Sequence, residues 1–247
     1  GPAGQNFYYS GGTMGGAGTV ALTKATLNFS GGLGTAMALL DGSNSTVAGP
    51  GTLTVQAGTA PSLTSCTLSA PTVIESGGTL TLGSSTVSGA LTNSGTLVAT
   101  GATAINGTFS AVAGSVLRPQ GVYLSHAVLT LLNGFTNYGA IQLTSTHTLY
   151  NATLAVTNGT LVNAPGASIE SQVGVGGTVT RALTAALDNR GTLTVAQPLS
   201  INKTAVAHVN TGTVTLTTGD LTVLLGGASP SFTTSGTIGV PTGRTLT

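Results

Sequence analysis

The sequence predicts an all-β fold: a single-stranded parallel β-helix (a β-solenoid) of about 12 coils of about 20 residues each. Three observations support this prediction. A Gly-Thr-aliphatic phrase recurs along the 247 residues of the chain, a second phrase advances with it at the same mean period, and both phrases alternate apolar and polar residues. The clear copies of the first phrase begin at Gly51, Gly78, Gly95, Gly159, Gly191, Gly212 and Gly236.

Both phrases have the pattern of short strands that are buried on one side. In residues 52–55 (Thr-Leu-Thr-Val) and 213–216 (Thr-Val-Thr-Leu) the apolar side chains share one face and the threonines the other, because successive strand residues point to opposite sides. Thr, Val and Ile favour strands, and the glycines between phrases favour turns. A single coil cannot bury its apolar face, so we expect the coils to stack around one core.

The second phrase, a small residue followed by Thr and an apolar residue, predicts a further strand in each coil, which makes two or three strands per coil. Val128 replaces the threonine in one copy. The threonines of the other copies are Thr26, Thr46, Thr67, Thr86, Thr108 and Thr153.

An asparagine recurs shortly before the glycine of the first phrase. Asn tolerates the left-handed backbone angles of turns, and stacked carboxamides can hydrogen-bond to one another from coil to coil. We therefore expect a structural ladder of asparagine side chains, with a polar recognition stripe as the alternative. The expected members of the ladder are Asn93, Asn137, Asn158, Asn189 and Asn210.

The domain organisation follows from where the repeat is present. We expect residues 1–17 to be an N-terminal entry or cap segment and residues 18–247 to be the parallel β-helix, as a fragment of a longer repeat protein. The phrases are furthest apart in residues 55–76 and 118–137. Loops carry function more often than cores do, so a binding surface is expected in these two stretches.

Composition argues against two classes of partner. Only 4% of residues are charged and the net charge is +1. The six basic residues are scattered, whereas phosphate binding needs them clustered on one face, so no nucleic-acid partner is expected. No apolar run is long enough for a membrane-spanning helix, so membrane insertion is not expected. The single cysteine, Cys66, falls on the apolar side of its phrase and is expected in the core.

The sequence offers little chemistry, and we expect a protein that is not an enzyme and holds no cofactor or metal. Among the five acidic residues, Glu170 and Asp188 are nearly one coil apart, with Arg181 and Arg190 nearby. If they stacked as neighbours, they would be the pair to test for polysaccharide cleavage, which needs two carboxyl groups near one bond. Surface or turn charges are the simpler interpretation.

Three smaller patterns leave alternatives open. His126 and His147 are separated by close to one coil length, but zinc needs three or four convergent ligands. Tyr123, Tyr138 and Tyr150 could bind carbohydrate, although turn packing is the preferred interpretation. Outward Thr-X-Thr pairs resemble the threonine arrays of ice-binding solenoids, although neighbouring coils interrupt them. The pairs are Thr52/Thr54, Thr79/Thr81, Thr178/Thr180, Thr192/Thr194 and Thr213/Thr215.

Residues 91–97 (Leu-Thr-Asn-Ser-Gly-Thr-Leu), 135–141 (Phe-Thr-Asn-Tyr-Gly-Ala-Ile) and 187–193 (Leu-Asp-Asn-Arg-Gly-Thr-Leu) resemble the repeats of filamentous-haemagglutinin-type exoproteins and of autotransporter passenger domains. The resemblance implies a right-handed β-helix on a bacterial cell surface that serves in adhesion. The expected function is therefore an extracellular structural or adhesive rod that displays loops or spaces a binding region from the cell. Its expected partners are a surface ligand of unknown identity, protein or glycan, and adjoining repeats of the same polypeptide.

Overall fold

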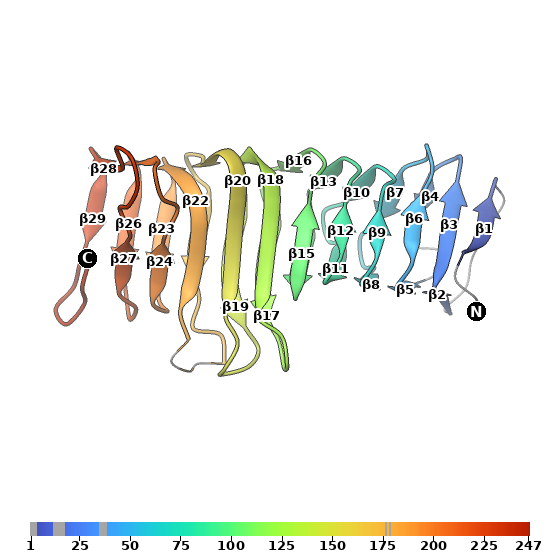
Figure 1. Cartoon of the computed structure of the whole chain (residues 1–247), viewed down its shortest axis with the longest axis horizontal. Coiled ribbons are helices and arrows are strands. Elements are labelled where there is room, and N and C mark those ends of the chain that lie inside the picture. The colour runs from blue at the N-terminus through green and yellow to red at the C-terminus, as the bar shows by residue number, and fades with distance from the viewer. Residues whose placement is uncertain (1–3, 12–17, 35–38, 176, 178) are drawn as a thin grey trace.

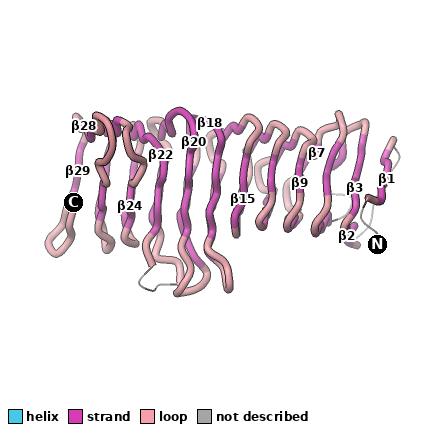
Figure 2. Tube along the Cα trace, in the orientation of Figure 1, coloured by secondary structure: helices cyan, strands magenta, loops and turns pink. Residues whose placement is uncertain are grey.

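The chain is a parallel β-solenoid in which successive coils lie side by side along the long axis (Figure 1). The computed structural model describes residues 4–11, 18–34, 39–175, 177 and 179–247. Every described residue that has regular secondary structure is in a strand or a bridge, and the strands are joined by loops and turns (Figure 2). All pairings between named strands are parallel, for example Thr192–Val195 on Thr213–Leu216. The predicted all-β stacked architecture is confirmed.

Each coil runs through three stacks of strands. We call them the first, second and third stack, in the order in which the chain passes through them within a coil. The first stack contains β1 (Gln5–Tyr9), β3 (Ala25–Phe29), β6 (Thr46–Ala48), β9 (Thr67–Leu68), β12 (Thr86–Val87), β15 (Ala102–Ile105), β24 (Leu199–Ile201) and β27 (Leu221–Val223). The second stack contains β4 (Leu33–Gly34), β7 (Leu53–Val55), β10 (Thr72–Ile74), β13 (Leu91–Asn93), β16 (Phe109–Ala111), β25 (Ala207–Asn210) and β28 (Ser231–Thr234).

Three long strands in the middle of the rod belong to both of these stacks. They are β18 (Ala127–Asn137), β20 (Ala152–Asn163) and β22 (Arg181–Asn189). The third stack is a separate sheet of 11 strands. It contains β2 (Thr19–Thr23), β5 (Leu39–Ser43), β8 (Ser62–Thr64), β11 (Thr79–Gly83), β14 (Thr96–Thr100), β17 (Val116–Gly121), β19 (Ala140–Ser145), β21 (Ser168–Ser171), β23 (Thr192–Val195), β26 (Thr213–Leu216) and β29 (Thr237–Gly239).

The third stack gives the number and length of the coils. Its 11 strands define about 11 coils of about 21 residues, close to the predicted values. Coil length is not constant in the register of this sheet: the coil from Thr79 to its partner Thr96 is the shortest, and the coil from Ala140 to its partner Ser168 is the longest. Ten intervals of about 4.8 Å make the rod about 48 Å long.

The core is built from columns of aliphatic side chains, one from each coil. In the third stack the second strand position forms such a column, and every member from Leu80 to Val214 is at most 1% exposed. Burying each of these side chains contributes roughly 1.5–3 kcal/mol. The column contains Leu80, Leu97, Leu117, Ile141, Ile169, Leu193 and Val214.

The glycine of the repeated phrase is required by a close approach between coils. A Cβ on Gly212 would lie 2.1 Å from the Gly191 carbonyl oxygen, and one on Gly236 would lie 2.1 Å from the Gly212 carbonyl oxygen. Real Cβ atoms do not come so close to backbone oxygens, and Gly212 and Gly236 do not have a positive φ. The expectation that these glycines simply favour turns therefore missed the main reason for their recurrence.

The N-terminal segment is partly described. Residues 5–9 of the predicted entry or cap segment 1–17 form β1, which pairs in parallel with β3, from Gln5 on Ala25 to Tyr9 on Phe29. Residues 1–3 and 12–17 lie outside the described residues. In the part of the chain that the structure describes, no helix has the length and apolar character needed to cross a membrane.

Candidate functional site

A ladder of buried asparagines runs along the second stack. The Asn137 Nδ2 group donates to Asn163 Oδ1 (2.9 Å), Asn163 donates to Asn189 (2.8 Å) and Asn189 donates to Asn210 (2.7 Å). Asn210 in turn donates to the Thr234 hydroxyl at 3.0 Å. All four asparagines are at most 1% exposed. The predicted ladder is confirmed.

The membership of the ladder differs from the prediction at Asn158. That residue is exposed in the middle of β20 and pairs in register with Asn133, whereas Asn163 occupies the ladder position. The prediction chose the asparagine nearest to a glycine. Both Asn158 and Asn163 follow a buried apolar residue by two positions, so local spacing does not separate them. The difference comes from the irregular register in the middle of β20, after which Asn163 pairs with Asn137 and Asn189.

Asn93 belongs to the same column but lies one rung away from the continuous ladder. It pairs with Ala111, which pairs with Asn137. Its Nδ2 group donates to the Val116 carbonyl at 2.9 Å, and its Oδ1 atom accepts the Gly95 N–H at 3.2 Å. Because these carboxamides are buried and bonded within the rod, their role is structural, and the alternative of an exposed recognition stripe is wrong.

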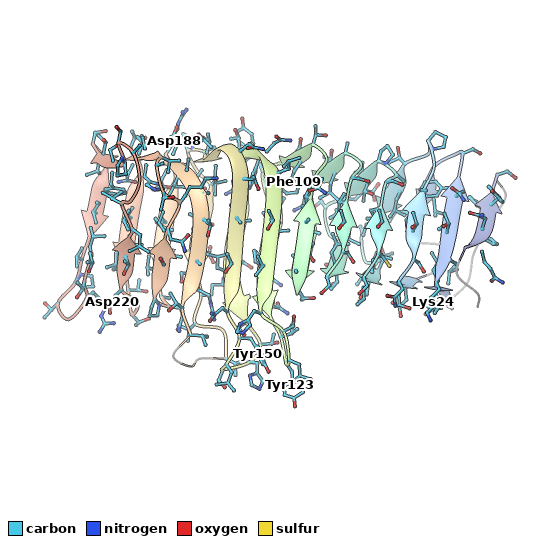
Figure 3. The ribbon with its side chains drawn as sticks, in the orientation of Figure 1. Lys24, Phe109, Tyr123, Tyr150, Asp188 and Asp220 are labelled. Carbon is cyan, nitrogen blue, oxygen red and sulfur yellow. The ribbon has the colours of Figure 1, made fainter. Side chains whose placement is uncertain are left out.

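The proposed acidic pair is not assembled. Glu170 lies in β21 of the third stack, next to Gln142 and Thr194, while Asp188 lies in β22 on the second stack, next to Val162 and Val209. Asp188 forms an ion pair with Arg190 at 2.6 Å. Figure 3 shows Asp188 at the edge of the rod opposite to Tyr123 and Tyr150. The hypothesis that Glu170 and Asp188 stack as neighbours is wrong. The corner segment between them lengthens this coil, so the chain has reached only the second stack at Asp188 and has not returned to the third stack, where Glu170 lies.

Arg181 also differs from the expectation that it lies near the carboxylates. It is fully buried, and its guanidinium donates to the backbone carbonyls of Gln172 (3.3 Å), Val173 (3.3 Å) and Tyr150 (3.5 Å). Burial lowers the pKa of this guanidinium from its ordinary value, although arginine keeps its charge in proteins. Arg181 therefore supports two loops from beneath.

These loops occupy one corner of the coil, between a third-stack strand and the following first-stack strand. In five coils this corner turns on a single residue in the left-handed region. The corner amides of the first four donate to a carbonyl of the next coil, as Ser65 N does to Gly83 O at 2.7 Å. The corner residues are Lys24 (φ 51°), Asn44 (φ 50°), Ser65 (φ 54°), Ser84 (φ 48°) and Gly101 (φ 60°).

The next three coils replace that compact corner with longer segments, which we call the loop cluster. Residues 122–126, 146–151 and 172–180 follow β17, β19 and β21. Figure 1 shows the described parts of these segments extending beyond the line of the other corners. One of them falls in the predicted stretch 118–137, whereas the predicted stretch 55–76 contains none. Insertions that fall in the same place in successive repeats often form a binding face.

Aromatic side chains gather in the loop cluster. Tyr150 packs against two histidines, with ring centroids 5.3 Å from His126 and 5.0 Å from His147, and Tyr123 lies 5.4 Å from His147. The Nδ1 atom of His126 accepts the Asn151 N–H at 2.9 Å. Figure 3 places Tyr123 and Tyr150 together on the projecting loops. The cluster is therefore tied across coils. It joins the two histidines, whose separation is close to one coil length, to two tyrosines that spacing alone did not relate. Tyr138 lies outside it.

Apolar side chains around these rings are open to solvent. Tyr123 is 69% exposed, Leu124 73%, Leu149 65% and Val175 62%. Leu124 also has a φ of 65°, which costs about 1 kcal/mol in a residue other than glycine. Leu124 shares this left-handed backbone with the compact corners, but it holds a large apolar side chain in water.

A strip of polar side chains, here called the polar strip (Arg118, Gln120, Gln142, Glu170 and Gln172), lies on and just beyond the three third-stack strands that lead into the loop cluster. Arg118 donates to Gln142 Oε1 from Nη2 (2.8 Å) and Nε (3.0 Å). Glu170 accepts from the Gln172 amide at 2.7 Å. The strip and the loop cluster occupy the same three coils, so together they form the candidate site.

The strip also interrupts the threonine array. Two outward columns of the third stack contain Thr79/Thr81, Thr192/Thr194 and Thr213/Thr215, but between them lie Val98, Arg118, Gln142 and Glu170. Thr52 and Thr54 flank Leu53 of the second stack, and Thr178 lies outside the described residues. Among the described residues, no group of three or more His, Cys, Asp or Glu side chains could hold a metal ion.

Comparison with models of protein families, with curated proteins and with solved structures finds no significant match in any of the three.

Proposed function

We propose that this chain is a rod segment of an extracellular surface protein, and that the rod presents the loop cluster as an adhesive site. The observation that carries the proposal is that three successive coils carry long segments at one corner, at residues 122–126, 146–151 and 172–180, and that two of these segments bring tyrosine and histidine rings into contact. The rest of the rod serves as a stiff support, since its coils are bonded through backbone pairs and buried carboxamides. The proposal assigns no reaction and no cofactor to the chain.

The scarcity of charge supports a surface rod of this kind. With 4% charged residues, the rod offers few sites for proteases that need lysine or arginine, and most of its length has no strong field to attract partners. We therefore assign the binding region to the loop cluster with its polar strip, where exposed rings and charged side chains occur in the same three coils.

The experiment that tests the proposal is adhesion of coated beads. Beads carrying the purified chain are compared, on cultured epithelial cells and on bacterial biofilm, with beads carrying a variant whose residues 122–126 are replaced by one serine, the corner used by neighbouring coils. The matched control is Tyr138→Ala, which removes an exposed tyrosine (57%) in a different turn. We expect the trimmed loop to abolish adhesion and the control to retain it. Equal adhesion of all three coatings, or none by the unaltered chain, would overturn the proposal.

A further inference from the structure

The candidate site combines two kinds of surface. The loop cluster supplies exposed rings and aliphatic groups, and the polar strip supplies a guanidinium, a carboxylate and amides. Gln120 pairs in register with Thr144, immediately before the loops begin, so the two surfaces are continuous along β17 and β19. At about 3.3 Å of rise per residue, Arg118 and Gln120 of the polar strip are about 7 Å apart along β17.

The chemistry of this surface matches a sugar. A pyranose has C–H faces that pack on aromatic rings and a rim of hydroxyl groups that both donate and accept hydrogen bonds. Tyr123 is held by its contact with His147 (5.4 Å) while 69% of its surface stays exposed. Rigid amphipathic rings of this kind provide contact area at low entropic cost. The flanking planar groups can bond two adjacent hydroxyls at once, as a guanidinium does with two oxygens.

The strip retains hydrogen-bonding capacity for such a ligand. Arg118 uses Nε and Nη2 on a single acceptor, Gln142 Oε1. Among the described residues, the Gln142 amide nitrogen donates no hydrogen bond, and the side chain is partly exposed. Because neighbouring coils repeat every ~4.8 Å, successive strands present these groups at regular intervals along the rod.

Charge distinguishes a neutral glycan from an anionic one. The strip holds one cation, Arg118, and one anion, Glu170, so its net charge favours neither sulfated nor carboxylated chains. We propose that the loop cluster and the polar strip together bind a neutral polysaccharide, with Tyr123 as the stacking platform and Gln142 as a hydroxyl-binding group. This inference rests on the proposed function and names its ligand class.

The test is binding of the full chain to immobilised polysaccharides, with neutral mannan, galactan and cellulose compared with heparin, polygalacturonate and collagen. We expect binding to at least one neutral polymer, and a roughly tenfold weaker affinity in Tyr123→Ala and in Gln142→Ala. Tyr138→Ala should bind as the unaltered chain does, and circular dichroism should show the same strand content in all variants.

Three outcomes would overturn the inference: binding only to the anionic polymers, binding only to collagen, or neutral-polymer binding that survives both substitutions. The bead experiment separates the two proposals. Beads that adhere through residues 122–126 while no neutral polymer binds would leave the adhesive rod standing and remove the glycan. If neutral-polymer binding is seen but the beads do not adhere, the site has a ligand and the adhesive role is wrong.

Discussion

Replacing Asn163 by alanine should weaken the middle of the rod by about 3 kcal/mol. The substitution removes three short hydrogen bonds: the one accepted from Asn137 (2.9 Å) and those donated to Asn189 Oδ1 (2.8 Å) and the Thr192 carbonyl (3.2 Å). It also removes a longer one, donated to the Ala167 carbonyl at 3.5 Å. Each short bond contributes roughly 1 kcal/mol net, and groups left buried without a partner add to the loss. Asn163 is fully buried, so water does not replace these bonds in the folded chain.

Two variants calibrate this expectation. Asn93→Ala removes two side-chain bonds, to the Val116 carbonyl and from the Gly95 amide, and should lose about 2 kcal/mol. Asn158→Ala changes an exposed residue and should stay within about 0.5 kcal/mol. Urea unfolding gives the overall loss. Hydrogen exchange gives the loss of stability near Asn163. The Arg190 and Gly191 amides report it, because both donate to the Asn163 carbonyl. The reasoning is refuted if Asn158→Ala costs as much as Asn163→Ala.

Three further predictions concern His208, Cys66 and Gly212. Burial lowers the pKa of His208 below its ordinary value of 6.5, against a smaller opposite effect of the Lys203 carbonyl, so the unfolded chain takes up this proton first. The contribution of neutral His208 to the free energy of unfolding should be fully present above about pH 6.5 and should be lost as the pH falls below that value. Thermal melts across this pH range should show a falling melting temperature, and His208→Gln should reduce this pH dependence. Burial raises the pKa of the Cys66 thiol, which is 2% exposed, so a chromogenic disulfide reagent should label it only after unfolding; rapid labelling of the folded chain would contradict its place in the core. Gly212→Ala should lower the free energy of unfolding by at least about 2 kcal/mol, because its Cβ would meet the Gly191 carbonyl oxygen at 2.1 Å. Gly18→Ala is the control, since a Cβ on Gly18 has no atom within 4 Å and should leave the stability unchanged. Equal unfolding midpoints for the two variants would show that the close approach does not matter.

The sequence was sufficient to predict the stacking of coils, because the repeated phrase depends only on neighbouring residues and on the adjacent coil. Alternation in residues such as 213–216 shows which side faces the core, and a recurring period shows that one coil supports the next. Both are set by neighbours in the chain or by the adjacent coil. The same information identified four of the five predicted ladder asparagines as members of one buried column, including Asn93, which a single alanine separates from the continuous part.

The candidate site was harder to predict because it depends on register across unequal coils. The separation of Glu170 and Asp188 along the chain is close to a coil length, yet the insertion at 172–180 and the path of the chain place them on different stacks. The same kind of insertion brings Tyr150 between His126 and His147, which no fixed spacing predicts. The burial of Arg181 could have been predicted, because it lies two residues before the inward Leu183 on the same strand and therefore points to the same side.

The compact corner has a consequence for how such a molecule diversifies. Where one left-handed residue suffices to turn the chain between two strands, a lengthened segment starts and ends at nearly the same points and disturbs only its immediate neighbours. Lengthening a flexible connection costs little additional entropy, since each doubling adds only about 0.6 kcal/mol. New recognition segments can therefore be inserted at the position of Ser65 or Ser84 while the apolar core stays unchanged. The chain is thus a scaffold whose binding specificity can be changed by replacing single corners.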